Sequence, residues 1–237
     1  MNLVNNLFKN SLFFAVDGCQ TGWICSTVMH FDIYINYYSN LEALKNTTLY
    51  IDIPVKLPKR INAYPRKEDL NAKKLLGSFH SSVFYAPIKS WLHLNYHQIN
   101  EQCEFYNKPK ISIQSFNLFK KIIEIQHLLN NDVTIKEIHP ELLFHSFLRN
   151  NKISKKKSSG LYQRILLINT LFNTRFNFKQ LLDQYHYIRD NHQTAALKLD
   201  DIVDSLFSGL LVNYFYHNNK NNDIIENSDC RKRFDLY

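Results

Sequence analysis

Glycine is scarce in this chain of 237 residues, which contains only five glycines and six prolines. Phosphate-transferring enzymes often hold the phosphates of a nucleotide in loops rich in glycine. Five glycines in the whole chain cannot supply the usual loops of this kind. The composition therefore disfavours a kinase-like enzyme, although small-molecule phosphotransfer on a related fold stays open as an alternative.

Cysteine is also rare, and long apolar runs are missing. The four cysteines form no CxxC pair and no dense framework, which is typical of reduced thiols in a cytosolic protein. The first apolar run, residues 12–16, is too short for the core of a signal peptide and continues into Asp17. No run approaches the roughly 20 apolar residues of a membrane span. We therefore expect a cytoplasmic protein that has no membrane segment.

Acidic residues are outnumbered by basic ones, 21 to 29, and the formal net charge is +8. Such a charge is compatible with a polyanionic partner such as nucleic acid. The sequence is also crowded with Asn, Lys, Ile, Phe and Tyr, as drift in an AT-rich genome would produce, and that drift alone raises the isoelectric point. The hydrophobic fraction of 45% is sufficient for the core of a globular protein.

The first quarter of the chain has the pattern of a mixed sheet. Residues 11–19 form an apolar run typical of a central strand, and residues 22–38 predict two further strands with a turn near His30–Asp32. A short helix is expected at 39–46, with Ser39 as its cap. Tyr50, Ile51 and Ile53 then predict a fourth strand, which Pro54 ends. The order predicts an α/β protein.

Helical patterns dominate the remainder, apart from one strand expected within residues 132–141. We expect one domain over residues 1–216, with a helical insertion at about 66–130 after the fourth strand, and a polar tail at 217–237. Helices are predicted over residues 66–77, 90–106, 114–130, 141–149, 158–173 and 200–216.

Carboxylates recur where the predicted strands and helices begin or end. On a helix, Asp200 and Asp204 lie about 40° apart, and Asp201 lies about 60° from Asp204. Each of these acidic residues, taken alone, also has an ordinary structural interpretation, as a turn residue or as a helix cap. Together they predict that Asp17, Asp52 and at least one of Asp201 and Asp204 converge at one edge of the sheet, and they leave open which of the other carboxylates join them. The set consists of Asp17, Asp52, Glu137, Glu141, Asp200, Asp201 and Asp204.

A bound divalent cation would offset the repulsion between these carboxylates. If the first and fourth strands are neighbours, Asp17 and Asp52 lie side by side and repel each other, which raises one pKa. Mg²⁺ is commonly held by one or two carboxylates together with water and a substrate phosphate. Two such ions about 3.5–4 Å apart can activate a water and stabilise the leaving oxygen of a phosphodiester.

Eight blocks of the sequence resemble, in the same order, a known family. Over roughly residues 12–212 the chain is identified as a member of the family called domain of unknown function 429, regarded as predicted nucleases of the ribonuclease H-like fold. The blocks are VDGCQTGW, IDIPVKLPKR, RKEDLNAKKLLGS, SSVFYAP, ISIQSFNLFKKIIEI, EIHPELLF, KKKSSGLYQR and DDIVDSL.

The resemblance implies a ribonuclease H-like mixed sheet flanked by helices, and it implies roles for the acidic residues. The DDIVDSL block is also similar to the last helix of Holliday-junction resolvases. By this similarity Asp17, Asp52, Asp201 and Asp204 are metal ligands and catalytic residues, with Glu137 as a further catalytic candidate, and the cofactor is Mg²⁺ or Mn²⁺. The sequence departs from the family pattern at Lys73 or Lys74 (arginine expected), at Gln126 (an acid expected) and at Ser205 (alanine expected).

Four further residues are candidates for substrate binding. Arg66 and Lys73 share one helical face with Asp69, so they predict either a phosphate contact or solvated ion pairs. Lys157, in the run Lys155–Lys157 that precedes Arg164, either follows a nucleic-acid backbone or belongs to a solvated loop. His139 is flanked by carboxylates and either transfers a proton or fixes the turn before Pro140.

The sequence therefore predicts a metal-dependent nuclease, an enzyme that hydrolyses phosphodiester bonds of nucleic acid with two metal ions. The alternative is a non-catalytic binding or scaffolding module that keeps the fold and uses its carboxylates as caps and ion pairs.

Overall fold

The computed structural model describes residues 13–29, 32–44, 46–129, 133–148, 153–155, 157–174, 177–192, 194 and 197–217. The chain divides into two compact units: residues 1–52 together with 132–237 form the first, and residues 53–131 form the second. The helical insertion therefore begins directly after Asp52, before the expected residue 66. Most of the predicted tail, residues 218–237, lies outside the described residues.

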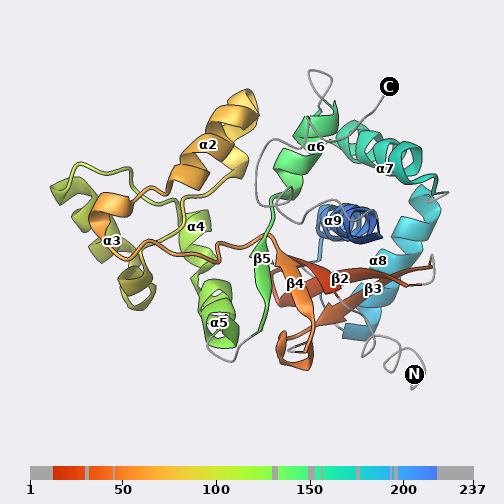
Figure 1. Ribbon diagram of the computed structural model, residues 1–237, viewed down its shortest axis with the longest axis horizontal. Helices are drawn as coiled ribbons and strands as arrows, with labels where there is room; N and C mark the ends of the chain where they lie inside the picture. Colours follow the sequence, from red (N-terminus) through yellow and green to blue (C-terminus); the bar gives the residue numbers. More distant parts are fainter. Residues whose placement is uncertain are drawn as a thin grey trace. The chain divides into compact units, whose positions relative to one another are not determined.

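The first unit contains a mixed sheet of five strands in the order β3-β2-β1-β4-β5 (Figure 1). The first three strands are antiparallel, whereas β4 and β5 run parallel to β1. This confirms an α/β protein with a mixed sheet flanked by helices. The strands are β1 (Phe13–Cys19), β2 (Gly22–Met29), β3 (Asp32–Tyr38), β4 (Thr48–Ile51) and β5 (Ile135–Glu137).

Four helices of this unit follow β5, and the last of them packs on the sheet. Helix α9 contacts β1 and β2, and α6, α7 and α8 contact α9 in turn. The core between them is built from apolar side chains such as Phe144 and Phe207, whose rings stack at 4.0 Å. The helices are α6 (Pro140–Leu148), α7 (Ser158–Phe172), α8 (Phe178–His192) and α9 (Leu199–His217).

The second unit is mostly helical. Its aromatic side chains pack on one another, with the Tyr64 and Trp91 ring centroids 4.8 Å apart. Its elements are η2 (Ile61–Ala63), α2 (Lys67–Leu76), η3 (Gly77–Ser82), η4 (Lys89–His93), α3 (Tyr96–Phe105), α4 (Ile113–Asn117) and α5 (Phe119–Leu129). Gly77 ends α2 with φ at 54°, a conformation that favours glycine.

Several sequence predictions need correction. Helix α8 was not predicted, and the helix expected at 39–46 is only the short 3₁₀ turn η1 (Glu42–Leu44). In that turn Asn40, rather than Ser39, accepts the N–H of Glu42 at 3.2 Å. The helix expected at 90–106 is divided into η4 and α3, and the one at 114–130 into α4 and α5. Residues 30 and 31 of the predicted turn lie outside the described residues.

Within the described part of the chain, no helix has the length and apolar character needed to cross a membrane.

Candidate acidic site

The parallel strands β1, β4 and β5 bring their last residues to the same edge of the sheet. Val16 pairs with Ile51, and the backbone N–H of Asp52 donates to the Val16 carbonyl at 3.2 Å. Ile51 in turn pairs with Glu137 on β5. Asp17 lies within β1, and Asp52 directly follows β4. The strand directions and the register place these predicted neighbours at adjacent positions near the same edge of the sheet.

Helix α9 supplies the second group of carboxylates from its first two turns. Asp201 accepts the backbone N–H of Lys198 at 3.1 Å, as a residue near a helix start often does. Asp204 is almost fully buried. The next residue, Ser205, donates its hydroxyl toward the carbonyls of Ala15 at 3.0 Å and Ile24 at 3.2 Å. This contact anchors the helix beside β1 and so places Asp204 close to Asp17.

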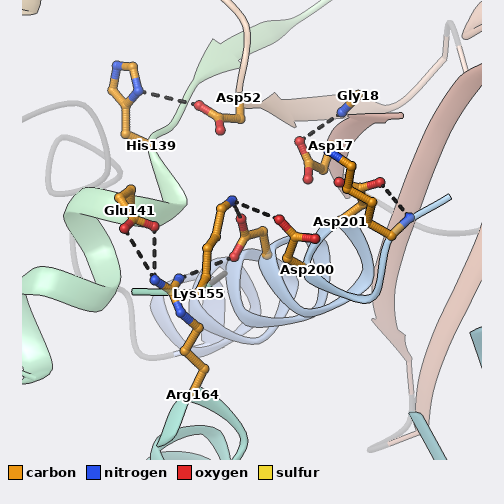
Figure 2. Close-up of polar contacts among 11 residues, drawn as sticks. Asp17, Gly18, Asp52, His139, Glu141, Lys155, Arg164, Asp200 and Asp201 are labelled. Atoms are coloured by element: carbon orange, nitrogen blue, oxygen red, sulfur yellow. Dashed lines mark hydrogen bonds and ion pairs between the residues drawn. The ribbon is translucent and has the colours of Figure 1, made fainter. Parts of the chain in front are cut away.

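Lys155 lies among these carboxylates and points its ammonium into the cluster (Figure 2). Its Nζ pairs with Asp204 and lies 3.6 Å from Asp200. Burial acts to lower the lysine pKa, but attraction to Asp204 and Asp17 outweighs it and raises the pKa. Lys155 is therefore a permanent counter-charge of the site.

Arg164 on α7 is a second internal cation. Its Nη2 donates to both oxygens of Glu141 at 3.0 and 3.2 Å, and its Nη1 donates to Asp204 at 3.4 Å. The guanidinium also lies over the ring of Phe144, 4.3 Å from its centroid. The side chain is completely buried, so its contacts are structural and hold α6, α7 and α9 together at the site.

His139, between β5 and α6, lies against two carboxylates. Its Nδ1 is 3.4 Å from Asp52 Oδ1, and its Nε2 is 3.4 Å from Glu137 Oε1. Burial acts to lower the pKa of the imidazole, but hydrogen bonding and attraction to both carboxylates raise it to about 10. His139 is therefore charged at neutral pH, with 26% of its side chain exposed.

Two further carboxylates, Asp17 and Asp201, are attracted by Lys155, but this attraction does not offset the effects that raise their pKa values. Burial and the charges of Asp201, Asp204 and Asp52 raise the pKa of Asp17, and burial together with Asp200 raises the pKa of Asp201 to about 7. Among the described residues, neither Asp17 nor Asp201 makes an ion pair; each accepts a backbone N–H, that of Gly18 at 2.8 Å and that of Lys198. Burial raises the pKa of Asp204 as well, despite its pairing with Lys155 and Arg164, so Asp17 and Asp201 differ from it in making no ion pair among the described residues.

The chemistry of this donor set suits a hard divalent cation, because carboxylate oxygens are the ligands that Mg²⁺ and Mn²⁺ prefer. In the part of the chain that the structure describes, however, no three His, Cys, Asp or Glu side chains converge as a complete set of metal ligands. Asp204 is paired with Lys155, and this pairing occupies one of the carboxylates that could otherwise join such a set.

The structure places Asp17 within electrostatic reach of Asp52, Asp201 and Asp204, and His139 lies between Asp52 and Glu137. Three other residues are predicted to bind substrate. Arg66 is 8% exposed and forms an ion pair with Asp69 in the second unit. Lys73, in the same unit, donates to the His80 carbonyl at 3.1 Å. Lys157 is exposed just before α7 and makes no ion pair with a described residue. Their roles in binding substrate stay predictions.

Sequence reasoning missed the internal roles of Lys155 and Arg164. The basic run predicts either a contact with a nucleic-acid backbone or a solvated loop, whereas in the structure both residues are paired with carboxylates. The signal was present in part, because Lys155 belongs to the same basic run as Lys157. Which lysine of the run enters the acidic site depends on how the segment before α7 packs against α9. No local sequence pattern specifies that packing.

The sheet is mixed, and carboxylates lie near the ends of neighbouring strands and on the helix that covers the sheet. These features define the class of the protein, an α/β protein with an acidic site. Within that class, the chain belongs to the family described as proteins of unknown function, DUF429, whose profile matches residues 16–222. No curated protein and no solved structure matches the chain.

Proposed function

We propose that the protein is a metal-dependent phosphodiesterase of ribonuclease H-like fold that hydrolyses nucleic acid. The observation that carries this proposal is the pair Asp17 and Asp201. Both have raised pKa values, and neither has an ion-pair partner among the described residues. A divalent cation is the simplest species that would stabilise both as carboxylates at neutral pH.

The topology supports the same proposal. Three antiparallel strands are followed by two that run parallel to the first, and a long C-terminal helix crosses the sheet. This is the arrangement expected of a ribonuclease H-like protein. It also leaves the carboxylates of Asp17, Asp52 and Glu137 at one edge of the sheet.

Asp17 and Asp201 would hold the cation, with Asp52 beside them. When bound, a divalent cation lowers the pKa of a coordinated water and polarises a phosphoryl oxygen. Lys155 neutralises Asp204 and thereby limits repulsion within the helix. Positively charged His139, which is partly exposed, is suited to attract a phosphate oxygen of the substrate to the Asp52 edge.

A second candidate is the scaffolding module without catalysis. One observation favours it: Lys155, Arg164 and His139 already compensate Asp204, Glu141, Asp52 and Glu137, as in a structural ion-pair network. On this alternative the cluster stabilises the junction of the sheet edge with α6, α7 and α9, and added metal has no effect.

Thermal melts with and without millimolar Mn²⁺ test the proposal. A cation that binds only the folded protein stabilises it by about 2.7 kcal/mol at a hundredfold excess over Kd. We expect the wild type to gain stability, Asp17→Asn to lose most of that gain, and Asp183→Asn, an exposed aspartate on α8, to retain it. In Mg²⁺ or Mn²⁺, the wild type and Asp183→Asn should cleave labelled DNA or RNA, and Asp17→Asn should lose most of this activity.

Lys155→Met distinguishes the two functions. If the site binds a cation, removal of the competing ammonium should lower stability without metal and enlarge the gain with Mn²⁺. If the network is purely structural, the variant loses stability under both conditions alike. A wild type that shows no Mn²⁺ shift, even with a short oligonucleotide present, together with a metal-insensitive Lys155→Met, would leave the scaffolding module as the function.

A further inference from the structure

The positive charge of the chain is distributed very unevenly. Residues 53–131, the second unit, contain 12 of the 29 Lys and Arg residues but only five of the 21 Asp and Glu residues. This unit therefore carries a net charge of +7 out of +8 for the whole chain. Compositional drift raises the lysine content everywhere, so it does not account for a deficit of acids in one unit.

Five basic residues of this unit, which we call the basic stretch, are exposed. Four lie in the segment between β4 and the first turn of α2, and no acidic residue occurs between Asp52 and Glu68. Among the described residues, none of the five makes an ion pair. They are Lys56, Lys59, Arg60, Lys67 and Lys89.

The segment between β4 and α2 has a fixed backbone although, apart from η2, it has no regular structure. Three of its carbonyls in close succession accept hydrogen bonds from other parts of the unit. The Gln126 amide donates to Val55 at 2.8 Å, the Arg66 guanidinium donates to Lys56 at 2.9 Å, and the Lys89 N–H donates to Pro58 at 2.9 Å. The last bond also places Lys89 beside the segment.

Arg66 is itself held in place. Its guanidinium pairs with Asp69 inside the unit, and Asp69 also accepts the Ala86 N–H at 2.9 Å. A buried ion pair that is satisfied in this way has a defined geometry. Because the inward contacts fix the backbone, the cations are presented outward at a small cost in conformational entropy.

We propose that the basic stretch is a binding surface for the phosphate backbone of a nucleic acid. Exposed cations that make no ion pair bind polyanions by releasing counterions, and they do so without reading the base sequence. The choice of nucleic acid as the polyanion rests on the proposed function. The binding itself needs neither the metal nor the carboxylates of the first unit.

Fluorescence anisotropy of the full chain, in EDTA so that no cleavage occurs, tests the proposal. The probes are labelled single-stranded DNA, duplex DNA and RNA, each about 20 nucleotides or base pairs long. The test variant is Lys56→Gln/Lys59→Gln/Arg60→Gln. The control, Lys74→Gln/Lys120→Gln/Lys179→Gln, removes the same charge from exposed lysines elsewhere.

We expect the test variant to bind the preferred probe at least about tenfold more weakly near 0.1 M salt. The slope of log K against log[salt] should become shallower by about 2 to 3, because each lost phosphate contact contributes about 0.7–0.9. The control should stay within about threefold of the wild type. Asp183→Asn should bind like the wild type. Because EDTA removes the metal in every measurement, a failure of the proposed catalytic site leaves this result unaffected.

Three outcomes would overturn the proposal. In the first, no probe binds the wild type. In the second, test and control variants weaken binding equally, which means that only net charge matters. In the third, vesicles of phosphatidylserine and phosphatidylcholine bind through the basic stretch while the oligonucleotides do not, which identifies a membrane surface as the polyanion.

Discussion

Individual carboxylates at the sheet edge differ in how their charge is balanced. Asp204 is buried yet pairs with Lys155 and Arg164, whereas Asp17 and Asp201 accept only backbone N–H groups among the described residues. Burial without a cation makes the ionised form unfavourable, so the folded protein holds protons on these groups at a higher pH than the unfolded chain does.

The pH dependence of stability follows from these shifts. The Asp201 pKa is about 7 in the folded state against 3.8 in the unfolded state, so its contribution falls as pH rises through that window. The raised His139 pKa of about 10 gives stability that is complete below 6.5 and is lost as pH approaches 10. Without metal, we therefore expect the free energy of unfolding to decrease from about pH 5 to about pH 8.

Urea titrations across this range, in EDTA, measure the decrease. Asp201→Asn should flatten the curve between about pH 5 and pH 7, and His139→Gln should flatten it above pH 7. Asp183→Asn, on the exposed face of α8, serves as the control and should keep the wild-type shape. A stability that rises with pH over the same interval would show that these groups do not have the charges assigned to them.

The acidic members of the site could be predicted because each lies near the end or the start of a recognisable element: Asp17 in VDG lies near the end of β1, and Asp52 in IDIP directly follows β4. Their partners could not be predicted in the same way. Lys155 reaches Asp204 across 49 residues and Arg164 reaches it across 40, and both come from segments whose local pattern indicates only a basic run or an amphipathic helix. The tertiary fold decides which cation pairs with which carboxylate. The spacing of these residues in the sequence does not specify the pairs.

Among the elements, α9 determines the geometry of the site because it packs on β1 and β2 through small residues. Ser26 on β2 donates its hydroxyl to the Ser205 carbonyl at 2.5 Å, next to Gly209. A Cβ at position 209 would lie 2.5 Å from Ser26 Oγ. The close approach of helix and sheet therefore needs both the absent side chain at Gly209 and the position of the Ser26 hydroxyl.

A double-mutant cycle between these two residues tests this packing. In the wild type, Gly209→Ala should displace the Ser26 hydroxyl and offset the gain in helix propensity, which is about 1 kcal/mol. In the Ser26→Ala background the same change should be more favourable, by about 1–2 kcal/mol. Urea unfolding of the four proteins gives the coupling, and purely additive effects would mean that the contact does not limit the approach of α9.

Most elements were predictable, and the failures have identifiable causes. Alternating or continuous apolar runs with clear stops gave β1 to β4 and α2, which ends at Gly77. Helix α8 was missed because its sequence, FKQLLDQYHYIRDNH, is largely polar and buries only Leu181 and Ile188. The helix expected at 39–46 failed because few of its residues have apolar contacts: only Leu44 within η1 is buried. In both cases tertiary contacts outweighed local pattern.

At the scale of the whole molecule, the chain consists of two compact units, and the second interrupts the first between Asp52 and Asp132. Each buries its own apolar side chains: Leu206 on α9 belongs to the core of the first, and Ile99 on α3 is fully buried in the second. The sequence predicts a helical insertion at about 66–130, and the second unit spans residues 53–131. The segment between β4 and α2 has no regular structure apart from η2. That segment carries the basic stretch, so the boundary of the unit and its charged surface coincide.

Two units with separate packing should lose stability separately when one core is damaged. Ile99→Ala removes a fully buried side chain and should cost about 2–5 kcal/mol where the surrounding structure cannot relax. We expect hydrogen exchange, followed by mass spectrometry of peptides, to show faster exchange in α3 and α5 but unchanged protection of β1 and β2. Leu206→Ala should have the reverse effect, accelerating exchange in β1, β2 and α9 while α3 and α5 keep their protection. If either variant lowers protection by the same free energy in both units, the chain opens as one cooperative structure, and the basic stretch cannot be treated as part of an independently stable unit.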